Sequence, residues 1–238
     1  MPYSRSDKYA AYFTKDHLMG PNCFRLADEL LQNSPVPLTG RVLDLGCGTG
    51  LTSRFLAAET QAEVIAVDLW VDPTDNQRRF HEAGLHDKML AVRLDASGGL
   101  PFGNESFDAI VSVDAYHYFA CNDSYFASHL LPLVKPGGTV LIAVPGLKKE
   151  WDDGPSALML DWAGESDSAT FHSTEWWDKA IAGQDIAQKR IWEAECNRTA
   201  WQEWFATGHE YGLNDQKFFD AGLDGIMTLI CICVTKKA

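Results

Sequence analysis

One acid and three glycines within nine residues form the part of this sequence with the clearest capacity for chemistry. The run VLDLGCGTG at 42–50 places Asp44 two residues before Gly46, and Gly48 and Gly50 follow at alternate positions. Glycine accepts positive φ values and lets a ligand approach the backbone closely. The apolar residues before the glycines indicate a buried strand. A strand that turns through such glycines into a helix is typical of the first turn of a nucleotide-binding α/β sheet.

The spacing of this motif argues against a dinucleotide. A pyrophosphate-binding loop has the pattern G-x-G-x-x-G, whereas the pattern here is D-x-G-x-G-x-G. The carboxylate of Asp44 would repel a pyrophosphate and would favour a ligand that carries an ammonium group. S-adenosylmethionine (SAM) combines an ammonium, a sulfonium and an adenosine. The motif therefore points to SAM, with the methionine end near Asp44.

Two further acids follow the apolar runs predicted as the next two strands. The run at 63–70 contains Asp68, at the position where an acid binds a ribose diol in such sheets; the alternative for Asp68 is a helix N-cap. The run at 89–97 contains Asp95, which could accept from the adenine amine or serve as a turn residue. The carboxyl ends of parallel strands meet at one edge of the sheet, so the acids would form one ligand-binding row.

With these motifs in place, the sequence resembles the class I SAM-dependent methyltransferases, most strongly over 40–146. The stretch at 100–119, LPFGNESFDAIVSVDAYHYF, looks like the family's approach to its fourth strand, and 131–146, LPLVKPGGTVLIAVPG, like its Lys-Pro-Gly-Gly turn into the fifth. The resemblance implies an α/β fold: a Rossmann-like, doubly wound, mostly parallel seven-stranded sheet with one antiparallel strand and helices on both faces. It also implies methyl transfer from SAM, with S-adenosylhomocysteine (SAH) as the product.

The order of the predicted elements indicates a single methyltransferase domain over 1–238. Its parts are an N-terminal lid and helix, a SAM-binding core, a substrate-side insertion with late elements, and a final helix and strand, at 1–37, 40–146, 147–212 and 213–238. Asn22 is the predicted N-cap of the first helix, which Pro35 ends. The aromatic residues before Asn22 would either fold over the cofactor as a lid or simply pack on the domain.

The candidate cofactor-binding residues stand at or next to the predicted strand ends: Asp44, Gly46, Cys47, Gly48, Gly50, Asp68, Leu69, Asp95, Ala96 and Asp114. The candidate catalytic residues follow the fourth strand or belong to the N-terminal segment: Tyr116, His117, Tyr118, Tyr12 and His17. His117 has a side chain that titrates near neutrality, so it would act as a general base; the alternatives are that it lines the acceptor pocket or has a structural role at the start of a helix.

Tryptophan is concentrated in the second half of the chain. Seven of the eight tryptophans lie between 147 and 211. This concentration suggests an aromatic-lined cavity, with Trp151, Trp176 or Trp177 facing the transferable methyl group. The alternative is that these side chains pack in the core or at an interface.

The charge balance restricts the class of partner. The sequence has 20 Lys and Arg against 33 Asp and Glu, a net charge of −13, and no basic run. Phosphate contacts dominate affinity for nucleic acids, so a neutral or cationic small-molecule acceptor is favoured over DNA or RNA.

Other features of the sequence concern location and metals. No apolar stretch approaches the ~20 residues needed to span a membrane, and the N-terminus lacks the apolar segment of a secretory signal. We therefore expect a cytoplasmic protein without stable membrane association. The six cysteines are scattered, so we expect reduced thiols and no metal site.

The favoured function is methyl transfer from SAM to a small molecule by in-line displacement at the sulfonium. Three alternatives stay open: a methyltransferase acting on RNA or protein, a lipid-directed SAM enzyme, and a SAM-binding protein without catalysis.

Overall fold

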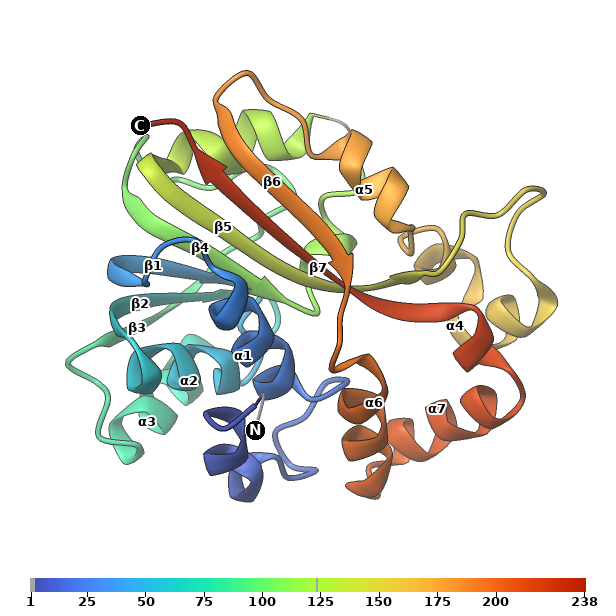
Figure 1. Ribbon diagram of the computed structural model, residues 1–238. Helices are drawn as coiled ribbons and strands as arrows, with labels where there is room; N and C mark the ends of the chain where they lie inside the picture. The colour runs from blue at the N-terminus through green and yellow to red at the C-terminus, as the bar shows by residue number, and fades with distance from the viewer. Residues whose placement is uncertain (1–2, 123) are drawn as a thin grey trace.

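A twisted seven-stranded sheet with helices on both faces organises the protein (Figure 1). The computed structural model describes residues 3–122 and 124–238. The strand order is β3-β2-β1-β4-β5-β7-β6. The strands are β1 (Thr39–Leu45), β2 (Gln61–Asp68), β3 (Met89–Arg93), β4 (Phe107–Val113), β5 (Val134–Leu147), β6 (Ile186–Glu193) and β7 (Met227–Lys236).

The helices divide into two groups. The α-helices are α1 (Cys23–Asn33), α2 (Leu51–Glu59), α3 (Pro73–Glu82), α4 (Ala157–Ser168), α5 (Thr174–Ala180), α6 (Asn197–Ala206) and α7 (Glu210–Asp220). The short helical turns are η1 (Ser6–Tyr12), η2 (Tyr116–Tyr118), η3 (Phe126–Leu130), η4 (Leu131–Leu133) and η5 (Leu223–Gly225). None of the helices in the described ranges is long and apolar enough to cross a membrane.

The strand directions confirm the expected fold class. β1, β2, β3, β4 and β5 pair in parallel, whereas β7 runs antiparallel to both β5 and β6. β1 has β2 on one side and β4 on the other, so the strand order reverses at β1. In open α/β sheets, ligands bind at such a reversal, beyond the carboxyl ends of the strands.

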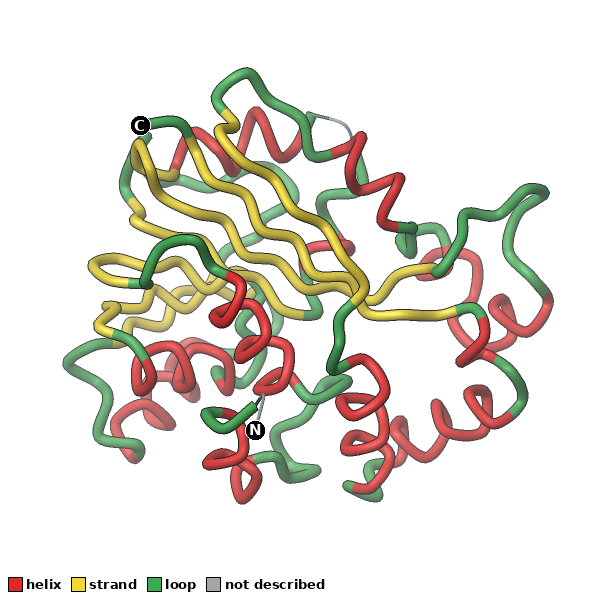
Figure 2. Tube along the Cα trace, in the orientation of Figure 1, coloured by secondary structure: helices red, strands yellow, loops and turns green. Residues whose placement is uncertain are grey.

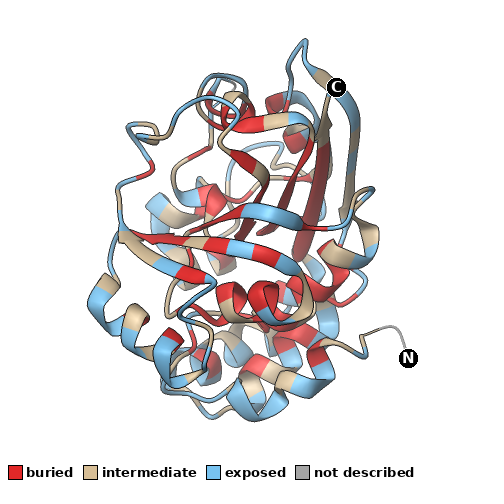
Figure 3. Ribbon diagram, turned by 90° about the vertical axis from the view of Figure 1, so that its left-hand side faces the viewer, coloured by how far each residue is buried: buried red, intermediate tan, exposed pale blue. Residues whose placement is uncertain are grey.

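Each face of the sheet carries its own apolar core, because successive side chains of a strand point to opposite faces. Val42 and Leu43 are neighbours on β1 but belong to different clusters. The Val42 cluster packs against α1, α2, α3 and α6, and the Leu43 cluster against α5 and the turns η2 to η4. Figure 3 shows the central strands as mostly buried. Burial on both faces holds the carboxyl ends of the strands in fixed positions.

Local sequence signals set several of the element boundaries. Asn22 caps α1, since its side chain accepts from the Phe24 amide at 2.9 Å. Ser173 caps α5 in the same way, accepting from the Trp176 amide at 3.4 Å. The expected strand at 185–196 is β6, and the expected late helix at 199–206 belongs to α6.

Two boundaries differ from the expectation. β3 ends at Arg93, so Asp95 lies in the loop after the strand, where its carboxylate accepts from the Ser97 amide at 2.9 Å. The N-cap of α3 is Asp72 rather than Asp68. The N-cap alternative for Asp68 is therefore wrong, because three residues separate the end of β2 from the cap of the next helix.

The region after β5 adds helices beyond the end of the sheet. Figure 2, in the orientation of Figure 1, shows α4, α6 and α7 beside the ends of the long strands β5 and β7. One carboxylate joins all three helices: Asp215 of α7 accepts from the indole N–H of Trp162 at 2.7 Å and of Trp204 at 2.8 Å.

Candidate active site

The loop after β1 adopts a backbone conformation with positive φ that its glycines make possible. Gly46 and Gly48 have φ of 77° and 53°, in the left-handed region that glycine adopts without strain. The amides of Gly46 and Cys47 donate to the carbonyl of Val67 on β2, at 2.8 and 2.9 Å. A Cβ at Gly46 would lie 2.2 Å from the Cβ of Ala115. A larger residue would therefore push the loop away from the end of β4.

Asp68 at the end of β2 is held by backbone donors. Its Oδ2 accepts from the Gly48 amide at 2.8 Å, and its Oδ1 accepts from the amides of Trp70 and Val71 at 2.8 and 2.9 Å. A carboxylate offers about four acceptor positions, so capacity for a further donor remains. These three bonds orient Asp68 and join it to the glycine loop.

Two adjoining pockets lie along the carboxyl edge of the sheet. The first pocket is walled by the N-terminal segment, the glycine loop and the end of β4; the second is walled by the ends of β2 and β3 and the η2 turn. Both are lined by Gly46, Asp68, Trp70, Ala115 and Tyr118. The empty space is about 740 Å³ in the first and about 730 Å³ in the second, part of it open to solvent.

Eight of the ten candidate cofactor residues line these pockets. Gly46, Cys47, Gly48, Asp68 and Asp114 line the first, and Gly46, Asp68, Leu69, Asp95 and Ala96 line the second. Gly50 is the exception with a structural role: it is the N-cap of α2, and a Cβ on it would lie 2.5 Å from the Phe80 ring.

Asp44 is the second exception. It is fully buried behind the glycine loop and lines neither pocket, so the expectation that it faces the ligand is not met by this geometry. Its Oδ2 accepts from the Ser53 hydroxyl at 2.5 Å, and its Oδ1 has no partner among the described residues. Burial raises the pKa of Asp44 to about 7. Asp44 therefore has a structural role behind the glycine loop, where it accepts a hydrogen bond from Ser53 of α2.

Asp114 directly follows β4 and has an unusual backbone. Its φ is 58°, and Asp is one of the few residues that tolerate this left-handed region. Its amide donates to the carbonyl of Ala143 on β5 at 2.8 Å. Burial, followed by the nearby negative charge of Asp215, raises the pKa of Asp114 to about 8.

Aromatic side chains form the rim shared by the two pockets. The rings of Trp70 and Tyr118 meet edge to face with their centroids 6.1 Å apart. Trp70 is 65% solvent-exposed and Tyr118 is 50% exposed. Tyr118 is thus the one residue of the predicted Tyr116, His117 and Tyr118 group that lines a pocket.

His117 and Tyr116 lie behind the pocket wall rather than on it. Both are 1% exposed, because the η2 turn directs their rings into the protein. Within residues 3–122 and 124–238, neither ring nitrogen of His117 has a hydrogen-bond partner. Burial lowers the pKa of His117 to about 3, which makes it a poor proton acceptor at neutral pH. Its expected role as a base stays a prediction that this placement does not support.

The two halves of the N-terminal segment have different places: η1 packs on the domain, and the stretch after it lines the first pocket. The ring centroid of Tyr9 in η1 lies 5.2 Å from that of Phe24 and 5.1 Å from that of Phe55. Tyr12 contacts the guanidinium of Arg54 and does not line the first pocket, contrary to expectation. The following stretch does line it, through Phe13, His17, Leu18, Met19, Gly20 and Pro21.

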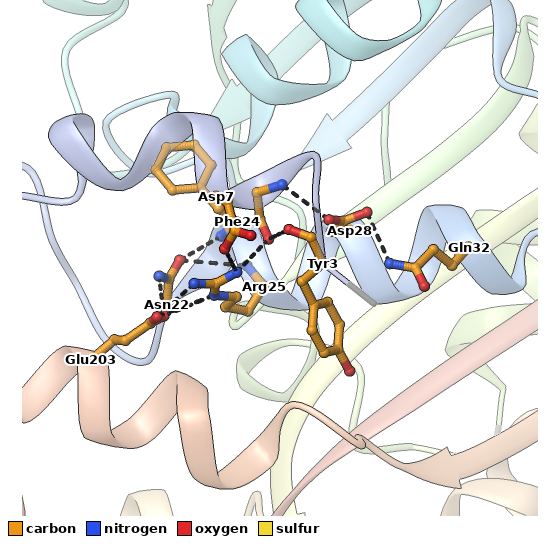
Figure 4. Close-up of polar contacts among 9 residues, drawn as sticks. Tyr3, Asp7, Asn22, Phe24, Arg25, Asp28, Gln32 and Glu203 are labelled. Carbon is orange, nitrogen blue, oxygen red and sulfur yellow. Dashed lines mark hydrogen bonds and ion pairs between the residues drawn. The ribbon is translucent and has the colours of Figure 1, made fainter. Parts of the chain in front are cut away.

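Polar bonds hold this lining stretch at both ends (Figure 4). Arg25 of α1 donates to Asp7 of η1 at 2.5 Å and to both carboxylate oxygens of Glu203 of α6, the shortest contact being 2.7 Å. Asn22 also donates to Glu203, at 2.6 Å. The backbone carbonyl of His17 accepts from the Thr49 hydroxyl at 2.7 Å, which attaches the stretch to the glycine loop.

The tryptophans of the second half do not form the expected cavity. Trp151, Trp176 and Trp177 line neither pocket, and Trp177, Trp201 and Trp204 are buried in the apolar cores. These three buried indoles therefore follow the alternative stated above, packing in the core. Phe13, Thr49 and Thr52 also line the first pocket, although none of them was among the predicted site residues. Only Phe13 had a signal, since it ends an aromatic-rich segment.

Comparisons with known proteins find methyltransferases. Residues 42–138 match the model of a methyltransferase domain family. A ubiquinone biosynthesis O-methyltransferase of Rhizobium etli is 32% identical over 117 residues, 47% of this chain and 44% of its own length. A dimethylglycine N-methyltransferase of Parasynechococcus marenigrum is 28% identical over 172 residues, 71% of this chain and 61% of its own length. The chain thus spans about half the length of these curated relatives.

The fold is shared with solved methyltransferase structures. Phosphoethanolamine N-methyltransferase 2 of Haemonchus contortus, in complex with SAM, superposes with a TM-score of 0.72 at 19% identity, covering 99% of this chain and 57% of that chain. The strand order and glycine loop, with acids after β2 and β4, define a class I methyltransferase fold. Residues 42–138 of this chain thus match a methyltransferase domain, and the chain as a whole has the fold of these solved methyltransferases.

Proposed function

We propose that this protein transfers the methyl group of SAM to a small-molecule acceptor. The observation that carries the proposal is the pair of adjoining pockets at the β1–β4 reversal. Their lining residues follow one another along the sheet edge in the same order as the adenine, ribose and methionine parts of SAM. The glycine loop lies in the middle, and Asp68 stands where the pockets meet.

The residues present fit such a cofactor. The glycine loop lets a ligand approach its backbone closely. A side chain at Gly48 would fill this space, because its Cβ would lie 3.1 Å from the sulfur of Met19. We assign the adenine to the second pocket beside Asp95 and Ala96, and the ribose hydroxyls to Asp68. The methionine end lies along Gly46, Cys47 and Gly48. When bound, SAM supplies a methyl group on a sulfonium, which is already a good leaving group.

The chain's own contribution is then orientation and exclusion of water. The first pocket contains space beyond the glycine loop, between the N-terminal segment and the end of β4. An acceptor held there faces the methyl group in line. Such positioning is worth roughly 7–11 kcal/mol in comparable reactions. The names of two relatives, a dimethylglycine N-methyltransferase and a ubiquinone biosynthesis O-methyltransferase, support this acceptor class.

A labelling experiment tests the proposal against its alternatives. The protein is incubated with SAM carrying a labelled methyl group and with a bacterial extract divided into small-molecule, RNA, protein and lipid fractions. We expect enzyme-dependent label in the small-molecule fraction, with heat-denatured protein as the control. Label confined to RNA, protein or lipid would assign the corresponding alternative, and binding of SAM without any labelled product would indicate a non-catalytic protein.

The charge of the protein supports a small acceptor over a nucleic acid. With a net charge of −13, we expect no saturable binding of mixed cellular RNA at physiological salt, because phosphate contacts supply most of the affinity in such complexes. A gel-shift titration measures this. Micromolar binding that weakens steeply with added salt would contradict the small-molecule proposal.

A further inference from the structure

Asp114 is a carboxylate without a counter-charge in the wall of the first pocket. Throughout the described part of the chain, its side chain makes no hydrogen bond and no ion pair. After burial, the negative charge of another acid, Asp215, raises the pKa of Asp114 further, and Asp215 is itself held by Trp162 and Trp204. Asp114 is only partly buried, so its carboxylate reaches the pocket but has little water around it and no protein donor. A cationic ligand in the pocket would supply the partner that the protein does not provide.

Another buried acid shows how this fold satisfies a carboxylate when no ligand is involved. Glu29 of α1 is 2% exposed and accepts four bonds of 2.8 to 2.9 Å. The donors are Tyr3, Trp192 and the amides of Glu195 and Cys196. Burial alone would raise the pKa of Glu29, but these donors lower it overall. Asp114 has none of these compensations, although the chain could supply them.

The rest of the first pocket is suited to a cation. Among its described lining residues there is no Lys and no Arg, and the acids are Asp68 and Asp114. Three aromatic rings, of Phe13, Trp70 and Tyr118, complete the wall. Aromatic faces attract ammonium groups. An acceptor with an anionic reactive end would meet repulsion from Asp68 and Asp114, with no Lys or Arg in the described lining to offset it.

We propose that Asp114 binds the nitrogen of a primary or secondary amine, which is the methyl acceptor of this protein. The proposal rests on the function proposed above. The carboxylate accepts an N–H of the protonated amine and takes that proton. The nitrogen lone pair then forms the new N–C bond while the S–C bond of SAM breaks, with its electron pair going to sulfur. The product is the protonated, methylated amine together with SAH.

A binding experiment on the SAH-saturated protein tests the assignment without knowledge of the natural acceptor. The probes are benzylamine and its neutral counterpart benzyl alcohol, titrated calorimetrically at pH 9. We expect the amine to bind about 10- to 100-fold more tightly than the alcohol, as a charged hydrogen bond warrants. Asp114→Asn should remove this preference. Asp87→Asn makes the same chemical change at an exposed side chain and should retain the preference.

The outcomes separate this proposal from the function on which it rests. SAH should bind wild type and Asp114→Asn with similar affinity; a large loss in the variant would place the cofactor's own ammonium on Asp114 and overturn the assignment. Equal binding of the two probes, no binding of the amine, or a preference that survives in Asp114→Asn would also overturn it. Failure of wild type to bind SAH would instead contradict the proposed function. Should Asp114→Asn not fold, Asp114→Gly replaces it, since glycine adopts a φ of 58° without strain.

Discussion

Gly20 of the N-terminal segment lies directly against the carboxylate of Asp114. A Cβ at Gly20 would stand 2.1 Å from Oδ2 of Asp114 and 3.3 Å from its Cγ. The absence of a side chain at this one position therefore lets the segment close over the end of β4 while the carboxylate still faces the pocket.

Gly20→Ala should displace the Asp114 carboxylate. We expect the rate of label transfer from SAM to fall about 10- to 100-fold, the range that small misplacements of reacting groups produce, while the affinity for SAH changes little. Gly225→Ala is the matched control, because a Cβ there meets nothing within 4 Å. Equal rates for Gly20→Ala and wild type would show that the position of Asp114 does not matter.

Asp68→Ala should weaken the binding of SAH by about 1.5–3 kcal/mol, the worth of a hydrogen bond to a charged group. The melting temperature should fall as well, since the amides of Gly48, Trp70 and Val71 lose their acceptor. Calorimetric titration with SAH measures the first effect. The control is Asp75→Ala, an exposed acid of α3 that forms an ion pair with Arg78. An unchanged affinity in Asp68→Ala would remove the ribose assignment.

The stability of the ligand-free protein should decline towards alkaline pH because of Asp114. Its pKa rises from 3.8 to about 8 on folding. Between these values the folded state holds a proton that the unfolded state has released. The stability that this proton contributes is complete below pH 3.8 and is lost as the pH rises through 8.

The melting temperature of Asp114→Asn should therefore rise relative to that of wild type as the pH increases from 4 to 9, by about 2–4 °C for each kcal/mol regained. Thermal melts across this pH range test the expectation. Asp44, whose pKa is also raised, is present in both proteins, so its contribution cancels. A difference in melting temperature that does not vary with pH would mean that the Asp114 carboxyl is not perturbed.

His117→Phe should leave methyl transfer nearly intact, because the ring is buried against Tyr118 and Phe171. A general base would instead contribute about 10²–10⁴ in kcat. Folding lowers the pKa of His117 from 6.5 to about 3, so the unfolded state takes up a proton below pH 6.5 that the folded state refuses. The variant should thus lose less stability than wild type between pH 6.5 and 3. Loss of kcat by a hundredfold would restore the role as a base.

Much of the fold could be predicted from local sequence. The glycine loop, the helix caps at Asn22 and Ser173 and the parallel strands each follow from a few adjacent residues. The position of Asp68 at a strand end was equally readable, because strand ends meet at one edge of a parallel sheet. The catalytic candidates were less readable. Adjacent residues such as His117 and Tyr118 point to opposite sides of the η2 turn, and only one of them reaches a pocket.

The sequence by itself determined which chemistry the chain carries: three glycines and a series of acids in the order of a SAM site, and a strongly negative charge. Only the tertiary structure decided how each acid is used. Asp44 is enclosed behind the loop, Asp68 is held by three amides, Glu29 is satisfied by four donors, and Asp114 is left open to the pocket. The physical reason is that the properties of a carboxylate depend on its burial and its donors, and these come from segments far apart in the chain.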